Sequence, residues 1–198
     1  MKHTLLTLLL LTALGSCRMP LVKGTTSDLW ISGNPIDSGW QMCGPGEFVV
    51  EDGVLKTTGG MGMLWYAAED FKNFEVELEW MVEDASYNSG VFVRFPDPGQ
   101  EPYVAVNHGY EIQICDVAGP KHNTGSVYSF QEATSMPTLE PGSWNRMRIQ
   151  VWDQHYKVYV NDQLVNEFEG DRSGHGFIGL QNHDDHSPVR FRNIRITR

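Results

Sequence analysis

The sequence has few cysteines, and beyond its first residues it has no long apolar run. The three cysteines are Cys17, Cys43 and Cys115. Cys17 lies shortly after the apolar N-terminal run. In the chain after this position, an intrachain disulfide is therefore limited to Cys43 and Cys115. Whether those two side chains meet cannot be read from their spacing, so this pairing stays open.

Basic residues are also scarce. The chain carries 15 lysines and arginines against 25 acidic residues, a net charge of −10. A surface of this sign repels nucleic acid and anionic lipid, which excludes both as expected partners.

Amphipathic helices are missing too: no window of a dozen residues holds a 3.6-residue apolar stripe free of glycine and proline. Instead, short segments of alternating apolar and polar residues are separated by Gly, Pro, Asn and Asp. This pattern predicts an all-β, antiparallel β-sandwich with helix as a minor component. The clearest predicted strands are 74–80, 90–94, 110–115, 145–152, 156–160, 176–181 and 189–197.

Two local features refine this prediction. Asn161-Asp162-Gln163 lies between two predicted strands and is typical of a hairpin turn. In the last strand Arg190 and Arg192 alternate regularly but Arg195 is out of phase, which breaks a simple inside–outside pattern.

The N-terminus has the form of a secretory signal. A charged start is followed by an apolar run over 5–14, interrupted by Thr7 and Thr12, and then by small residues. The run of about ten residues is too short to span a bilayer of roughly 30 Å as a helix. Residues 1–16 are therefore a predicted signal peptide; its removal takes away one lysine and no acid and leaves a charge of −11.

The segment LGSC at 14–17 resembles the lipobox of bacterial lipoproteins, in which the cysteine becomes the acylated first residue. Cys17 is thus the predicted lipidation site, with ordinary signal cleavage as the alternative. Each buried CH₂ of an acyl chain contributes about 0.8 kcal/mol to membrane binding. We expect an exported, periplasmic or cell-surface lipoprotein with a tether over 17–26, a domain over 27–198 and no membrane contact other than the lipid.

Six sequence blocks occur in an order typical of one family. They are NFEVELEW (73–80), NSGVFVR (88–94), GYEIQICD (109–116), TGSVY (124–128), PGSWNRMRIQV (141–151) and GFIGLQNHDDHSPVRFRNIRI (176–196). From about residue 30 onward the chain resembles the 3-keto-disaccharide hydrolase domain. The resemblance implies a jelly roll of the concanavalin A-like lectin and glucanase type. It also implies a small carbohydrate substrate, a glycoside oxidised to a ketone at C3 of a hexose.

Strand alternation sorts the residues of the predicted strand 110–115. Glu111 and Gln113 point to one face, while Tyr110, Ile112 and Ile114 point to the other. Because the apolar set must belong to the core, Glu111 and Gln113 are expected on the open face of the sheet.

The same alternation places Asn88, Gly90, Phe92 and Arg94 on one side of the preceding strand. If the two strands are neighbours, Arg94 and Glu111 share a face. A carboxylate, an amide and a guanidinium there would supply hydrogen-bond acceptors and donors for sugar hydroxyls. Four aromatic residues could stack on a pyranose ring or belong to the core: Trp65, Phe92, Tyr128 and Trp144.

His183 would share a strand face with Gln181 and can accept a proton, donate one or bind a metal. His122 and His175 lie in Gly-rich loops, where an exposed position is the default, as it is for His186 in its Asp-rich loop. The run from His183 to His186 could also be read as a metal cluster, although its spacing matches no standard site. The sequence identifies no cofactor, and a bound divalent metal is the possibility that it leaves open.

The family resemblance implies a mechanism. A ketone at C3 acidifies the C2 proton, so a base can remove it while an electrophile stabilises the enolate and the C1 oxygen departs; water then adds back. Glu111 and His183 are the predicted catalytic residues, each as base or acid. The predicted substrate-binding residues are Trp65, Asn88, Arg94, Gln113, Asp116, Tyr128 and Gln181.

Two other functions remain open from the sequence. A carbohydrate-binding module could use the same face without turnover, because this fold hosts many lectins. A retaining β-glucanase could use two carboxyls about 5 Å apart, and Glu75, Glu77 and Glu79 alternate along one predicted strand. If the family chemistry holds, an exported sugar 3-oxidoreductase is the expected functional partner.

Overall fold

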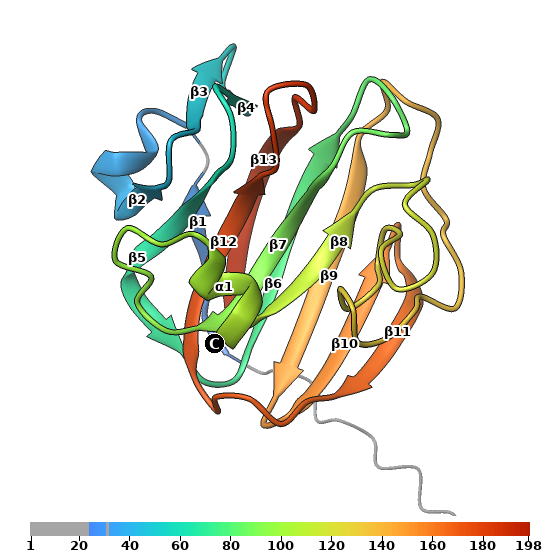
Figure 1. Ribbon diagram of the computed structural model, residues 1–198. Helices are drawn as coiled ribbons and strands as arrows, with labels where there is room; N and C mark the ends of the chain where they lie inside the picture. The colour runs from blue at the N-terminus through green and yellow to red at the C-terminus, as the bar shows by residue number, and fades with distance from the viewer. Residues whose placement is uncertain (1–23, 31) are drawn as a thin grey trace, which may run out of the picture.

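The computed structural model describes residues 24–30 and 32–198. The predicted signal peptide, the lipidation site Cys17 and most of the predicted tether lie outside these residues. Figure 1 shows the described chain as layered β-sheets, with the short helix α1 lying in front of one sheet. Within this part of the chain, no helix is long and apolar enough to cross a membrane.

The larger sheet has eight described strands in the order β11-β10-β9-β6-β13-β4-β3, with β1 pairing with β13. Its strands are β1 (Thr26–Trp30), β3 (Glu47–Glu51), β4 (Val54–Thr58), β6 (Phe74–Met81), β9 (Asn145–Trp152), β10 (His155–Val160), β11 (Gln163–Glu169) and β13 (Arg190–Thr197). Every pairing in it is antiparallel.

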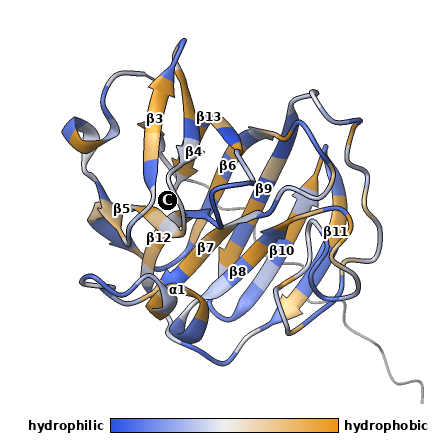
Figure 2. Ribbon diagram, turned by 45° about the horizontal axis from the view of Figure 1, so that its top comes forward, coloured by the Kyte–Doolittle hydropathy of each residue, from blue (hydrophilic) through white to orange (hydrophobic). Residues whose placement is uncertain are grey.

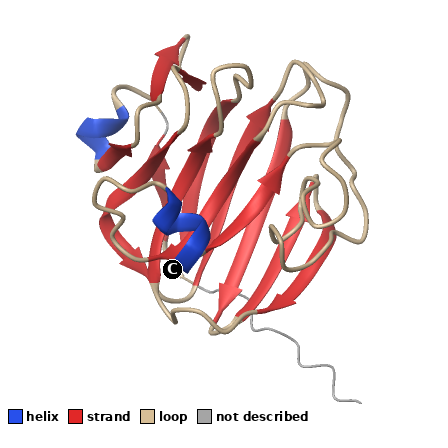
Figure 3. Cartoon of the chain, in the orientation of Figure 1, coloured by secondary structure: helices blue, strands red, loops and turns tan. Residues whose placement is uncertain are grey.

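The smaller sheet has five described strands in the order β2-β5-β12-β7-β8. Its strands are β2 (Trp40–Cys43), β5 (Gly62–Phe71), β7 (Ser89–Phe95), β8 (Tyr110–Ile114) and β12 (Gly176–Asn182). The helical elements are the 3₁₀ turn η1 (Pro35–Ser38) and the helix α1 (Tyr103–His108), so the prediction of an antiparallel all-β sandwich is confirmed (Figure 3).

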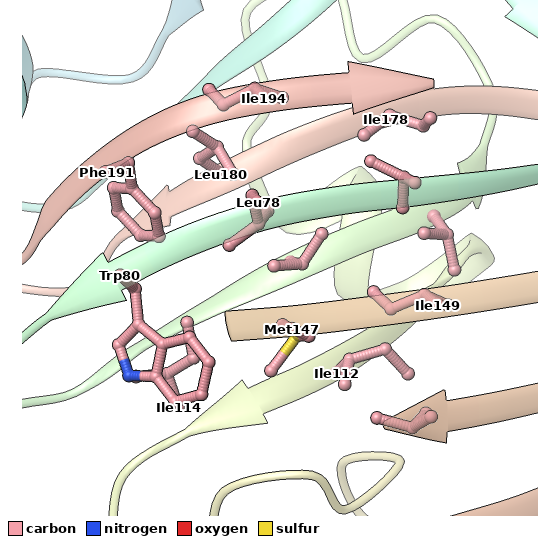
Figure 4. Packing of buried hydrophobic residues seen from close by; sticks show 14 of the residues in the cluster. Leu78, Trp80, Ile112, Ile114, Met147, Ile149, Ile178, Leu180, Phe191 and Ile194 are labelled. Atoms are coloured by element: carbon pink, nitrogen blue, oxygen red, sulfur yellow. The ribbon is translucent and has the colours of Figure 1, made fainter. Parts of the chain in front are cut away.

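The hydrophobic core lies between the two sheets. Hydrophobic and hydrophilic residues alternate along many of the strands (Figure 2), and the buried hydrophobic residues between the sheets form one cluster. Figure 4 shows Leu78 and Trp80 of β6 packing in one cluster with Ile112 and Ile114 of β8. Fully burying such side chains contributes about 1.5–3 kcal/mol each, which makes this layer the main source of stability.

The two cysteines of the described chain do not pair. Cys43 and Cys115 are both free and buried. The Cys115 thiol lies 3.8 Å from the carbonyl oxygen of Ser86. The disulfide that the sequence left open is therefore not formed.

Two backbone irregularities match the local sequence signals. Asn161 and Asp162 adopt φ values of 48° and 64°, the left-handed pair of a two-residue hairpin turn between β10 and β11. In β13 the register with β6 shifts between Arg192 and Arg195, and Asn193 has φ 53°. This β-bulge explains why the arginines of the last strand are out of phase.

Candidate functional site

The site lies on the outer face of the five-stranded sheet, where the side chains of Phe92, Glu111 and Tyr128 form a row. Glu111 of β8 is paired with Phe92 of β7, and Phe92 is paired with Gly179 of β12. On the other side of Glu111, the backbone N–H of Tyr128 donates to the Glu111 carbonyl at 2.9 Å. The segment around Tyr128 thus continues the sheet beyond β8, and Tyr128 lies next to Glu111.

A second row runs beside the first. Gly90 of β7 is paired with Gln113 of β8, and the backbone N–H of Gln113 donates to the carbonyl oxygen of Ser126 at 3.0 Å. In β12, Gln181 follows Leu180, which is paired with Val91, so Gln181 lies beside Gly90. Because Gly90 has no side chain, the carboxyl end of Glu111 occupies the space over it in the middle of this row.

Side chains of both rows line a cavity of about 350 Å³. The residues around it are Met61, Gly62, Asn88, Phe92, Pro102, Tyr103, Val106, Glu111, Gln113, Tyr128, Gln181 and His183. The structure therefore brings together most of the predicted site: Asn88, Glu111, Gln113, Tyr128, Gln181 and His183. Phe92 lies with them and also packs in a buried cluster with Phe95, so it both lines the cavity and belongs to the hydrophobic packing of this face.

Glu111 is buried rather than open to solvent, with only 3% of its surface exposed. Desolvation raises the pKa of its carboxyl group to about 8, and a hydrogen bond with the side chain of Gln181 acts in the opposite direction. A carboxyl group in this environment is largely protonated at neutral pH and can donate a proton.

Amide groups complete the polar side of the cavity. The Gln113 side-chain N–H donates to Asn88 Oδ1 at 2.9 Å. Gln113 Oε1 and Gln181 Oε1 are buried and have no hydrogen-bond partner. Buried acceptors without partners are uncommon in folded proteins. Among those of the described residues, these two belong to residues that line the cavity. They can accept hydrogen bonds from hydroxyl groups of a ligand.

His183 forms a pair with its neighbour Asp184. His183 Nδ1 lies 2.6 Å from Asp184 Oδ2. Burial of the Asp184 carboxyl opposes its charge, but hydrogen bonds from His183 and from the His186 backbone hold its pKa below the usual value. A carboxylate partner requires the hydrogen on Nδ1, which leaves the Nε2 lone pair of a neutral His183 ring free to accept a proton.

Arg94 does not share a face with Glu111, so that prediction is wrong. Arg94 has φ 60°, and the pairing of β7 with β12 shifts at this point. The bulge turns the side chain into the protein, where it is fully buried. Its guanidinium group donates to the carbonyl oxygens of Ser173, at 3.0 Å, and Lys72. It also lies 5.9 Å from the ring centroid of Tyr156. Arg94 is therefore a structural residue.

Trp65 and Asp116 also lie outside the cavity. Trp65 is on the correct sheet face, but Phe177 and Phe95 pack edge-on against it at centroid distances of 4.8 and 6.3 Å. Asp116 lies past the end of β8, where its Oδ1 accepts a hydrogen bond from Thr124 at 2.5 Å. Trp144 contacts Arg192, 3.9 Å from its ring centroid, on the eight-stranded sheet.

The cavity wall that the sequence did not predict comes from two connections. Pro102, Tyr103 and Val106 belong to the segment around α1, and Met61 and Gly62 lie at the start of β5. Alternation along strands carries no information about these residues, because their place over the sheet is set by tertiary packing. The aromatic residue Tyr103 next to Pro102 was the one signal available in the sequence.

The glutamates that suggested a β-glucanase lie in the other sheet. Glu75 pairs with Arg148 at 3.3 Å, Glu77 pairs with Arg146, and Glu79 pairs with Arg192 at 2.5 Å. This ladder of ion pairs accounts for the E-V-E-L-E pattern.

The run from His183 to His186 does not assemble a metal cluster. Across residues 24–30 and 32–198, no group of three or more His, Cys, Asp or Glu side chains has a geometry that could hold a metal ion. His183 and Asp184 bind each other instead.

Comparison with known proteins decides the family. The model of the 3-keto-alpha-glucoside-1,2-lyase-like domain matches residues 20–197. The chain belongs to this family. A 3-keto-disaccharide hydrolase of Bacteroides thetaiotaomicron is 26% identical over 217 residues, covering 80% of this chain and 74% of that protein.

Solved structures share the fold of this chain. A crystal structure of a candidate glycosyl hydrolase from Parabacteroides distasonis is 26% identical, with a TM-score of 0.72 over 87% of this chain and 98% of that one. A carbohydrate-binding module of Bacillus subtilis has a TM-score of 0.60 at 13% identity, covering 81% of this chain and 96% of the module. The second likeness concerns the fold alone.

Proposed function

We propose that this protein cleaves the glycosidic bond of 3-keto-glycosides, with Glu111 and His183 as its catalytic residues. The observation that carries the proposal is the position of Glu111, a buried carboxyl group with a raised pKa at the floor of the cavity. A perturbed acid in a cavity lined by polar groups is a standard indicator of catalysis. The family assignment supplies the substrate class.

The two residues divide the proton transfers. His183, whose Nε2 is free to accept a proton, removes the hydrogen from C2, which the C3 ketone acidifies. The electron pair moves into the C2–C3 bond and onto the ketone oxygen, giving an enolate. When the enolate collapses, the C1–O bond breaks and a C1=C2 double bond forms. Protonated Glu111 then gives its proton to the departing oxygen.

Water completes the reaction. Its oxygen adds to C1 of the unsaturated ketone, and the proton held by His183 returns to C2. Glu111 recovers its proton from the same water, so both residues end as they began. The net result is one water consumed and one glycosidic bond hydrolysed.

The charge of the cavity favours neutral sugars. Among the described residues around it there is no lysine or arginine. Gln113 Oε1 and Gln181 Oε1 offer acceptors for hydroxyl groups, and Asn88 holds the Gln113 amide in place. A uronic acid or a sugar phosphate would bring an uncompensated negative charge next to Glu111, which costs free energy in a desolvated site.

The experiment that tests the proposal is turnover of 3-keto-trehalose or a methyl 3-keto-glucoside, followed by loss of substrate. We expect release of the aglycone by the wild type and a loss of at least a hundredfold in Glu111→Gln. Binding of these compounds without turnover would instead identify a carbohydrate-binding module. Glu77→Gln, in the ion-pair ladder of the other sheet, is the matched control and should leave turnover unchanged.

The proposal extends to the location of the protein. The signal-like N-terminus and Cys17 support an exported lipoprotein at the cell surface or in the periplasm. There it would meet products of a sugar 3-oxidoreductase, the class of enzyme that forms the ketone. Mass spectrometry of the mature N-terminus that shows an unmodified Cys17 would contradict the lipid anchor.

A further inference from the structure

One wall of the cavity is apolar and faces a polar floor. Pro102, Tyr103 and Val106, in and next to α1, form this wall, whereas Glu111 and Gln113 belong to the floor. A sugar ring has an apolar face of C–H groups and a polar rim of hydroxyl groups, so it can satisfy both sides of such a cavity.

Exposure separates the inner part of the cavity from its mouth. Glu111 and Phe92 are 3% exposed, but Tyr103 is 59% exposed. If Glu111 acts on the scissile bond, the ring being cleaved lies over the sheet near Phe92. The remainder of the glycoside then extends outward to the mouth of the cavity, where Tyr103 is exposed.

The wall is built into the fold rather than added when a ligand binds. Ala105, on the inner side of α1, is fully buried in a cluster with Trp65 and Phe95 of the sheet. At the C-terminal end of the helix, the Arg172 guanidinium donates to the carbonyl oxygens of Val106, at 2.8 Å, and Gly109. Tyr103 is therefore presented by a helix that is held in its middle and at its C-terminal end.

We propose that Tyr103 is the stacking residue of a subsite for the aglycone, and that this subsite accepts a second sugar ring. The inference rests on the proposed function, because Glu111 sets the position of the scissile bond. An exposed aromatic ring presented by a fixed helix loses little conformational entropy on binding, so its contact with an apolar sugar face appears almost entirely as affinity.

Equilibrium titration tests this with two ligands, 3-keto-trehalose and methyl 3-keto-α-glucoside, in Glu111→Gln protein, which leaves them intact. Adding Tyr103→Ala should weaken binding of the disaccharide about five- to tenfold, and that of the methyl glycoside less than twofold. Tyr103→Phe keeps the ring and should restore the disaccharide to within about twofold. Tyr159→Ala, on the eight-stranded sheet, is the control for loss of an aromatic ring elsewhere.

Equal weakening of both ligands by Tyr103→Ala, or no change in either, would overturn the aglycone subsite. Failure to bind either ligand would overturn it as well. These results differ from failure of the proposed function, which would be a wild type that binds both ligands without turnover. In that case a selective effect on the disaccharide would still support Tyr103 as a binding residue for the second ring.

Discussion

The side chain of Glu111 lies directly against the backbone of Gly90 on the neighbouring strand. A Cβ atom on Gly90 would lie 2.8 Å from Glu111 Cγ and 3.0 Å from its Cδ, and closer still to Oε1. The carboxyl group thus occupies the space that a side chain would take on β7. The missing side chain at position 90 allows a carboxyl group to be buried at the floor of the cavity.

Gly90→Ala should therefore impair catalysis more than folding. The methyl group would meet the movable end of Glu111 and displace the carboxyl group, and a shift of about 1 Å can cost on the order of a hundredfold in rate. We expect kcat to fall at least tenfold with a largely preserved thermal unfolding midpoint. Gly174→Ala is the matched control, because nothing lies within 4 Å of its added Cβ. Unchanged kcat in Gly90→Ala would contradict this account of Glu111.

The pH dependence of the rate shows whether Glu111 acts as the acid or as the base. Because the pKa of Glu111 is raised to about 8, the carboxyl group loses its proton as the pH rises above that value. If it must donate a proton, kcat/KM should fall about tenfold per pH unit above pH 8. A kcat/KM that increases through pH 8 would assign Glu111 as the base and exchange its role with His183.

The free energy of unfolding should also depend on the ionisation of Glu111. Below about pH 4.5 the carboxyl is protonated in both the folded and unfolded states. Between there and about pH 8 only the unfolded state loses the proton, so the free energy of unfolding decreases as pH rises and levels off above pH 8. Glu111→Gln has no carboxyl group to ionise and so shows no such decrease. As pH rises, its free energy of unfolding relative to that of the wild type should therefore increase by a few kcal/mol, on the order of 1.4 kcal/mol per unit of pKa shift.

Thermal and urea unfolding of both proteins between pH 4 and pH 9 measure this difference. A difference in free energy that stays constant with pH would show that Glu111 is not held protonated in the folded state.

Asp184 should matter through His183. Asp184→Asn keeps the size of the side chain but removes the carboxylate that fixes the hydrogen on Nδ1. We expect kcat to fall about ten- to a hundredfold with KM nearly unchanged, since Asp184 does not line the cavity. Asp185→Asn, at the next position, is the control. A rise in KM alone would instead make Asp184 part of substrate binding.

The sequence predicted those parts of the site that depend on local strand geometry. Alternation along β8 put Glu111 and Gln113 on the face opposite Ile112, and the cavity lies on that face. It did not predict that this face would be covered. The helix α1 has only six residues, too few to produce a recognisable periodic pattern, and its position depends on the distant Arg172.

Arg94 illustrates a different limit. Alternation assumes a regular strand, and one residue with positive φ reverses every assignment after it. Arg94 is held by hydrogen bonds to the carbonyl oxygens of Ser173 and Lys72, which lie outside the strands and far from Arg94 in the sequence. Its conformation therefore depends on tertiary contacts.

The most direct test of the central claim is the turnover of methyl 3-keto-α-glucoside by purified wild-type protein, with unoxidised methyl α-glucoside as the second substrate. Loss of the 3-keto compound with release of methanol, no reaction of the unoxidised glucoside, and at least a hundredfold slower turnover in Glu111→Gln are the predicted results. Equal cleavage of both glycosides, or a Glu111→Gln variant as fast as the wild type, would contradict the account.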